Sequence, residues 1–102
     1  MNSKPQLSVL VVVHNEEAQL ADCLDSVQFA DEIVVLLDRC TDNSRKIAAR
    51  YTSCLIEGAW EIEGVRRNTG INACSGDWIF EVDADERVSM ELANEIRDTI
   101  SQ

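Results

Sequence analysis

Two aspartates that follow an apolar stretch are the residues of this sequence best suited to chemistry. The stretch from Trp78 to Val82 is rich in β-branched and aromatic side chains, which predicts a short buried strand. It ends at Asp83, Ala84, Asp85 and Glu86, whose carboxylates repel one another unless a cation compensates them. Because one small residue separates Asp83 from Asp85, both can reach a hard divalent cation, which prefers oxygen ligands.

The same segment has a plainer interpretation, in which it is an acidic turn that joins a strand to a helix. Asp85 or Ser89 would then cap that helix through a side-chain oxygen. Both interpretations predict the same local structure, so the rest of the chain has to separate them.

The composition is that of one small acidic domain. With 102 residues, of which 45% are hydrophobic, the chain can bury a modest core. Its net charge of −10 repels phosphate backbones and argues against nucleic-acid binding. No apolar run approaches the ~20 residues that cross a bilayer, so we expect no transmembrane segment. The four cysteines contain no Cys-x-x-Cys pattern, which argues against a zinc site. Each lies in an apolar or helical context, which predicts small buried thiols in a reducing compartment.

Apolar patterning predicts strands that alternate with helices. The expected strands cover residues 7–13, 33–37, 53–57 and 77–82. The expected helices begin after Asn15, after Thr41 or Asp42, near Ile62 and after Ser89, although Gly70 lies inside the third. This βαβαβαβα order predicts right-handed crossovers and a parallel sheet.

Polar residues follow three of the expected strands. They are the segments His14–Glu16, Asp38–Arg39 and Asp83–Glu86. The carboxyl ends of parallel strands lie along one edge of a sheet, and open α/β sheets bind their ligands there. The sequence therefore predicts a ligand site built from these three segments.

A nucleoside diphosphate is a ligand that these residues suit. Asp38 could bind the base and Asp83 the ribose hydroxyls, while Asp85 could hold a divalent cation that bridges the phosphates. Arg67 could add a planar donor fork on the phosphate side, although Arg66 and Arg67 also suit the solvated face of a helix. There is no Gly-x-Gly-x-x-Gly after the first strand and no Walker loop, which excludes the common dinucleotide and P-loop sites.

Four segments together resemble the nucleotide-sugar-binding half of a family 2 glycosyltransferase with the GT-A fold. The resemblance covers about Leu7 to Ile100 and is similar in detail to the bacterial lipopolysaccharide-core β-glucosyltransferase branch. The matching segments are Val11–Glu17, Ala30–Val35 with Thr41–Ser44, Arg67–Ile71 with Ser75–Trp78, and the DXD-like Asp83–Arg87.

The resemblance implies an α/β, Rossmann-like GT-A half-domain, with a mainly parallel four-stranded sheet flanked by helices. Residues 1–102 would form a single nucleotide-sugar-binding domain that is a piece of a longer one. Its substrates would be a UDP-sugar and a saccharide or lipid-linked saccharide acceptor. The anomeric centre would be inverted, and the protein would be cytoplasmic, peripheral at the inner membrane.

The resemblance also implies roles for individual residues. Asp85, with Asp83, would hold Mg²⁺ or Mn²⁺, and Asp83 would also contact the ribose or sugar. Glu16 would face the nucleotide, Arg67 would lie near the diphosphate, and His14 would pack beside the base.

The chain departs from the family pattern in two places. Leu37 precedes Asp38 where an aspartate is usual, and Arg39 replaces a glycine, which puts the base contact in question. No position matches the carboxylate that takes the acceptor proton, so we expect no catalytic residue within this chain.

A non-catalytic nucleotide- or metal-binding module is therefore the alternative function. A phospho-acceptor signalling domain fits poorly, because Lys4 and Lys46 are not at strand ends. We also expect self-association that covers an open sheet edge.

Overall fold

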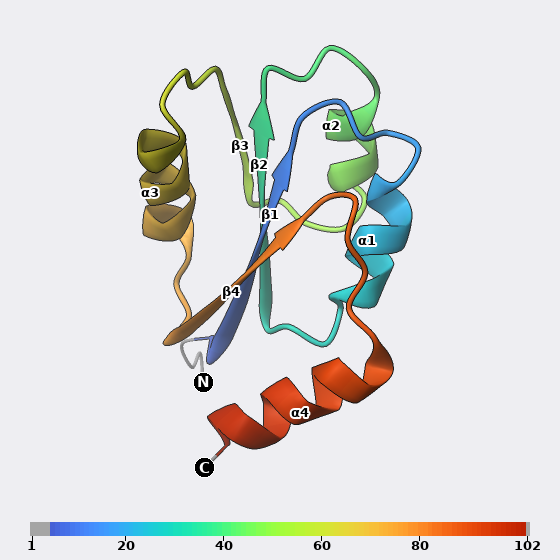
Figure 1. Cartoon of the computed structure of the whole chain (residues 1–102), viewed down its shortest axis with the longest axis vertical. Helices are drawn as coiled ribbons and strands as arrows, with labels where there is room; N and C mark the ends of the chain where they lie inside the picture. Colours follow the sequence, from blue (N-terminus) through green and yellow to red (C-terminus); the bar gives the residue numbers. More distant parts are fainter. Residues whose placement is uncertain (1–4, 102) are drawn as a thin grey trace.

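The strand β1, Leu7–Val13, is the element around which the other strands are arranged. The computed structural model describes residues 5–101 and shows β1 in the middle of a parallel sheet of order β3-β2-β1-β4 (Figure 1). Its side chains are almost wholly buried, as its β-branched sequence predicted.

The elements follow the predicted βαβαβαβα order, and the expected α/β architecture is confirmed. The other strands are β2 Glu32–Asp38, β3 Leu55–Gly58 and β4 Trp78–Asp83. The helices are α1 Leu20–Ser26, α2 Ser44–Ala48, α3 Glu63–Ala73 and α4 Met90–Ile100. None of the helices within residues 5–101 combines the length and apolarity that crossing a bilayer requires.

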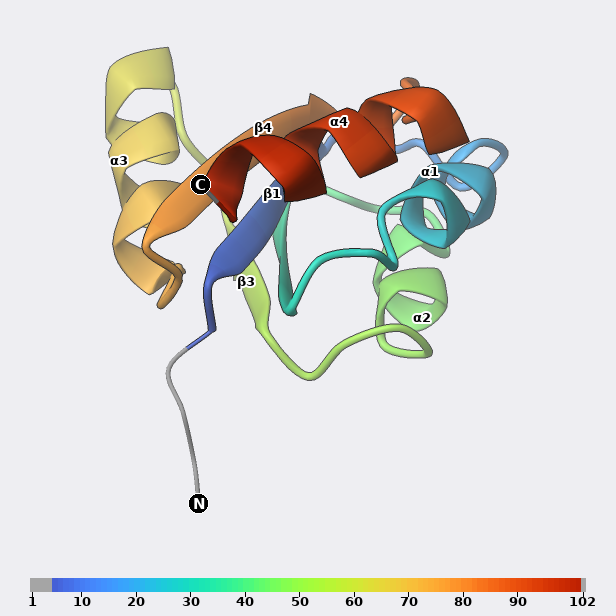
Figure 2. The same cartoon turned by 90° about the horizontal axis from the view of Figure 1, so that it is seen from below.

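Alternate side chains of β1 enter two separate cores, one on each face of the sheet. Val9, Val11 and Val13 pack with α1, α2 and part of α4, whereas Leu10 packs with Leu36 under α3. Figure 2 shows α3 on one side of the sheet and α1 and α2 on the other. The α3 face holds the smaller core, so its helix depends on fewer buried contacts.

Two predicted helix caps have different outcomes. Ser89 caps α4 as expected, with its Oγ accepting a hydrogen bond from the Leu92 amide at 3.1 Å. The expectation that Asn15 caps the first helix is wrong, because α1 begins only at Leu20. Asn15 has φ 49°, in the left-handed region that asparagine tolerates, and uses its side chain to join two loops.

The prediction of buried thiols holds for one of the four cysteines. Cys23 lies on the buried face of α1, whereas Cys40 and Cys74 are partly exposed and Cys54 is exposed. All four are free thiols. Cys54 lies just before the short edge strand β3, where fewer elements are available to cover it.

Gly70 lies inside α3 because the helix approaches the sheet closely there. A Cβ at this position would lie 2.8 Å and 3.0 Å from the two δ carbons of Leu10. A glycine inside a helix costs helix propensity, and here it provides the space that the buried Leu10 needs.

We predict that Gly70→Ala destabilises the protein by about 1–3 kcal/mol, because overpacking outweighs the gain in helix propensity. Gly64→Ala is the matched control, since a Cβ there meets nothing within 4 Å and should be neutral or stabilising. Urea unfolding of both variants measures the difference. A Gly70→Ala protein as stable as Gly64→Ala would contradict the close approach.

The predicted self-association remains a prediction, and β4 is the edge that would carry it. β4 is one of the two outer strands in the described sheet, and Trp78 and Ile79 on it are 52% and 37% exposed. An apolar groove lined by Trp78, Phe80 and Ile96 runs between β4 and α4. We expect a mass above one chain by light scattering, more so in high salt, which screens the charge of −10. A single-chain mass at both salt concentrations would contradict it.

Candidate functional site

The three predicted polar segments lie together at the carboxyl edge of the sheet. Val13 is in register with Leu37 of β2, and Val12 is in register with Asp83 of β4. The Ala84 amide donates to the Val12 carbonyl at 3.2 Å, which extends this pairing past the end of β4. The expected convergence of these strand ends is therefore confirmed as geometry.

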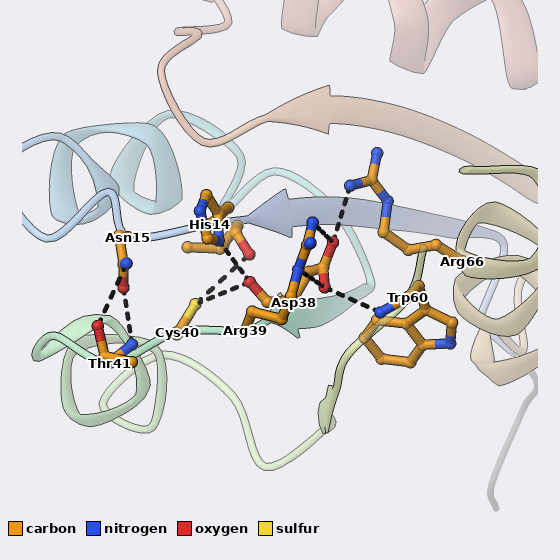
Figure 3. Close-up of polar contacts among 9 residues, drawn as sticks. His14, Asn15, Asp38, Arg39, Cys40, Thr41, Trp60 and Arg66 are labelled. Carbon is orange, nitrogen blue, oxygen red and sulfur yellow. Dashed lines mark hydrogen bonds and ion pairs between the residues drawn. The ribbon is translucent and has the colours of Figure 1, made fainter. Parts of the chain in front are cut away.

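Asp38 is the central side chain of this edge, and it is wholly buried, with 0% exposed. Its Oδ1 accepts hydrogen bonds from Arg39 Nε at 3.0 Å and the Trp60 amide at 3.2 Å. Its Oδ2 accepts from Arg66 Nη1 at 3.0 Å and Arg39 Nη2 at 3.3 Å (Figure 3). Both carboxylate oxygens are thus occupied by groups of the protein itself.

These contacts determine the ionisation of Asp38. Burial by itself would raise the pKa of the carboxyl, but the hydrogen bonds from Arg66, the Trp60 amide and Arg39 outweigh it. The net effect holds the pKa of Asp38 below its usual range. Asp38 is therefore a buried carboxylate that holds Arg39, Arg66 and the Trp60 amide at the carboxyl edge of the sheet.

The arginine of α3 that reaches this edge is Arg66, which the sequence did not single out. Arg67 instead forms an exposed ion pair with Glu81 in the middle of β4, at 3.0 Å. The helical period by itself does not choose between the two arginines. Arg66 and Arg67 lie four and three residues before Gly70, the position where α3 meets the sheet, and both spacings share a face of the helix.

Arg39 occupies the position where the family pattern suggested glycine, and its backbone adopts a conformation that favours glycine. Its φ is 51°, which is uncommon for a residue with a side chain. The guanidinium folds back onto Asp38 through two hydrogen bonds. These charge-assisted bonds offset part of the cost of the left-handed backbone.

The loops after β1 and β2 are joined by side-chain hydrogen bonds. Asn15 Oδ1 accepts from the amides of Thr41 and Asp42 at 2.7 Å and 3.2 Å. The Glu16 amide donates to Ser44 Oγ at 3.1 Å, so the backbone of Glu16 starts the turn toward α1. The side chain of Glu16 is only partly exposed, and it accepts a long hydrogen bond of 3.4 Å from Gln19.

His14 extends from the end of β1 and is exposed. Its Nδ1 lies 2.8 Å from the backbone carbonyl oxygen of Asp38, so the ring is held against β2 (Figure 3). The predicted site residues His14 and Asp38 are thus in direct contact.

Asp83 and Asp85 are exposed carboxylates with no ion-pair partner within residues 5–101. Burial, then the charges of Glu86 and Asp85, raise the pKa of Asp83, and Arg66 opposes them. No group of three metal-ligating side chains occurs in this described part of the chain. Two carboxylates nevertheless fit Mg²⁺, which commonly takes one or two carboxylates together with substrate phosphates.

The fold is that of an α/β domain with a parallel sheet, and acidic side chains gather at the carboxyl ends of its strands. The model of the family "Glycosyl transferase family 2" matches residues 8–101, and the chain belongs to this family.

Curated relatives support the family and show how much of it the chain covers. The "Uncharacterized glycosyltransferase RT0209" of Rickettsia typhi is 32% identical over 92 residues, covering 89% of this chain and 32% of that protein. The "Lipopolysaccharide core biosynthesis glycosyltransferase LpsC" of Rhizobium meliloti is 30% identical over 101 residues, covering 90% and 36%. The chain therefore spans about a third of the length of the curated relatives it matches.

Solved structures confirm the Rossmann-like GT-A half-domain. TarS 1–349 from S. aureus gives a TM-score of 0.76 at 25% identity, covering 94% of this chain and 32% of that one. TarS 1–349 has also been solved in complex with UDP. The mannosyltransferase PcManGT from Pyrobaculum calidifontis, in complex with GDP-Man and Mn²⁺, gives a TM-score of 0.76 at 22% identity, covering 93% and 32%.

We predict that Asp38→Asn destabilises the protein by about 3–5 kcal/mol at neutral pH, because Arg66 and Arg39 lose their buried carboxylate. The pKa of Asp38 is lowered in the fold, so its stabilisation is present above the usual pKa of about 3.9 and is lost as the pH falls further. Urea unfolding should therefore show a difference from wild type that shrinks below about pH 4.

The control for this experiment is Glu57→Gln, which breaks the exposed ion pair of Arg45 and Glu57. Exposed pairs contribute about 0–1 kcal/mol, so this variant should stay close to wild type. Equal losses in the two variants would show that the buried cluster of Asp38 is not a special source of stability.

Proposed function

We propose that this domain binds the nucleoside diphosphate sugar, a UDP-sugar, from which a family 2 glycosyltransferase transfers a glycosyl group. The observation that carries the proposal is the register of Val12 with Asp83, together with the contact between His14 and Asp38. These pairings bring Asp83, which has no ion pair within the described residues, to the same edge of the sheet as His14 and Asp38. The UDP complex of TarS and the GDP-Man and Mn²⁺ complex of PcManGT support it by analogy of fold.

We assign Asp83 and Asp85 as ligands of a divalent cation, Mg²⁺ or Mn²⁺. Asp83 would also accept a hydrogen bond from a ribose hydroxyl. Both are exposed and lack an ion pair within the described range, so their charge is available to a ligand. When bound, the cation would stabilise the charge of the leaving diphosphate.

Arg66 is better placed than Arg67 to add positive charge near this cation. Arg66 lies close enough to Asp83 to oppose the rise in its pKa, and its side chain is partly buried against Asp38. Arg67 would first have to leave Glu81, which an exposed ion pair of this kind permits at small cost. Glu16 takes part through its backbone, which fixes the loop after β1.

The complete transfer reaction would involve parts of the longer relatives that this chain does not span. We propose inverting transfer to a saccharide or lipid-linked saccharide, and the LpsC relative supports a role in lipopolysaccharide-core synthesis. The proton of the acceptor hydroxyl requires a general base, which we expect to lie outside the matched segments of this chain. Nucleotide binding and sugar transfer are therefore to be assayed separately, and binding without transfer would favour either a non-catalytic module or a piece of a longer transferase.

The expected result with the 102-residue chain is Mn²⁺-dependent binding of UDP and UDP-glucose in calorimetry. Asp85→Asn and Asp83→Asn should each weaken Mn²⁺ binding by about tenfold or more, since each removes a carboxylate ligand. Asp98→Asn on α4 is the control, because it removes the same charge from an exposed position outside the acidic segment. Equal Mn²⁺ affinity in the Asp85→Asn and Asp98→Asn proteins would rule out the cation assignment.

The same variants should not lose stability, which separates ligand binding from folding. The pKa of Asp83 is raised in the fold, so its ionised form opposes folding above that pKa and this cost is relieved as the pH falls. Asp83→Asn should therefore keep or raise the melting temperature at neutral pH in a thermal scan. A clear drop would mean that Asp83 has a structural partner.

A further inference from the structure

The carboxylate of Asp38 is not available to a nucleotide base, although its position in the sequence suggested that role. The side chain is 0% exposed, and each oxygen already accepts two hydrogen bonds from Arg66, Arg39 and the Trp60 amide. Freeing one oxygen would leave a buried charge with fewer partners, which is costly. If a base binds at this edge, another group must recognise it.

The hydrogen bond between His14 and Asp38 determines what the histidine ring can do. A carbonyl oxygen only accepts, so Nδ1 of His14 must carry the hydrogen of the 2.8 Å bond to Asp38. In the neutral ring the other nitrogen, Nε2, is then an acceptor. His14 is exposed, and no residue within 5–101 pairs with its Nε2.

We propose that Nε2 of His14 is the acceptor that recognises the ring N–H of the nucleotide base, and so selects uracil over cytosine. The inference rests on the proposed function, because it names the base of that same ligand. Uracil carries a hydrogen on N3, which Nε2 can accept. Cytosine has a lone pair on N3, so it would face the lone pair of Nε2 in the neutral ring, and the hydrogen bond would be lost.

Arg66 and Arg39 are positioned by the same residue as His14. Both arginines are held on Asp38, the same residue that orients His14 (Figure 3). Asp38 is thus a positioning residue: its backbone carbonyl fixes the tautomer of His14, and its carboxylate fixes the guanidinium groups.

The tautomer is tested first, without any nucleotide. His14 is the only histidine of the chain, so ¹⁵N-detected spectra of the imidazole contain one residue and need no assignment. We expect neutral His14 to carry its hydrogen on Nδ1. A hydrogen on Nε2 would overturn the proposal, whatever the protein binds.

Base selection is tested by calorimetry with UDP and CDP in the presence of Mn²⁺. Wild type should bind UDP about tenfold more tightly than CDP, because one hydrogen bond is gained with UDP and an unpaired acceptor is avoided. His14→Phe keeps a flat ring without the acceptor and should bind both nucleotides with nearly equal affinity. His14→Glu restores a group that only accepts when it is ionised and should recover most of the preference.

The outcomes separate this inference from the proposed function. If wild type binds UDP and CDP equally, or if His14→Phe keeps the wild-type preference, the inference is overturned while nucleotide binding stands. If wild type binds neither nucleotide at any Mn²⁺ concentration, the proposed function fails, and the inference fails with it.

Discussion

The buried ion cluster of Asp38 is the interaction on which the carboxyl edge of the sheet depends. Asp38 is the last residue of β2, and its carboxylate binds Arg39 of its own loop, Arg66 of α3 and the amide of Trp60. A wholly buried charge persists only when its hydrogen-bonding capacity is filled, so these elements are constrained to one arrangement. The cluster therefore joins the sheet, the loop after β3 and helix α3.

Two kinds of carboxylate lie within this edge, and their environments differ. Asp38 is neutralised by guanidinium groups, and its pKa is lowered. Asp83 has acidic neighbours and no ion pair within the described residues, and its pKa is raised. The ion pairs of Asp38 stabilise the fold. The carboxylates around Asp83 repel one another, and a bound cation would reduce that repulsion. The surroundings of the two carboxylates therefore shift their pKa values in opposite directions.

Two residues at the carboxyl edge of the sheet adopt a left-handed backbone conformation, which costs free energy in residues with a side chain. Asn15 and Arg39 both have φ near +50°, and both use their side chains to make hydrogen bonds that hold this conformation. The loops after β1 and β2 are consequently held by hydrogen bonds within the chain, and the exposed ring of His14 is held by its contact with the backbone of Asp38. Preorganised loops reduce the entropy that binding has to overcome.

The sequence by itself determined the order of the elements, the parallel sheet and the edge at which polar residues gather, because hydrophobic periodicity and strand direction are local properties. It also identified His14, Asp38, Asp83 and Asp85 as neighbours at that edge. It could not show that Asp38 is saturated or that Arg66 is the arginine that reaches it. Those facts depend on which face of α3 meets the sheet and on how closely it approaches, and only the tertiary packing around Gly70 decides both.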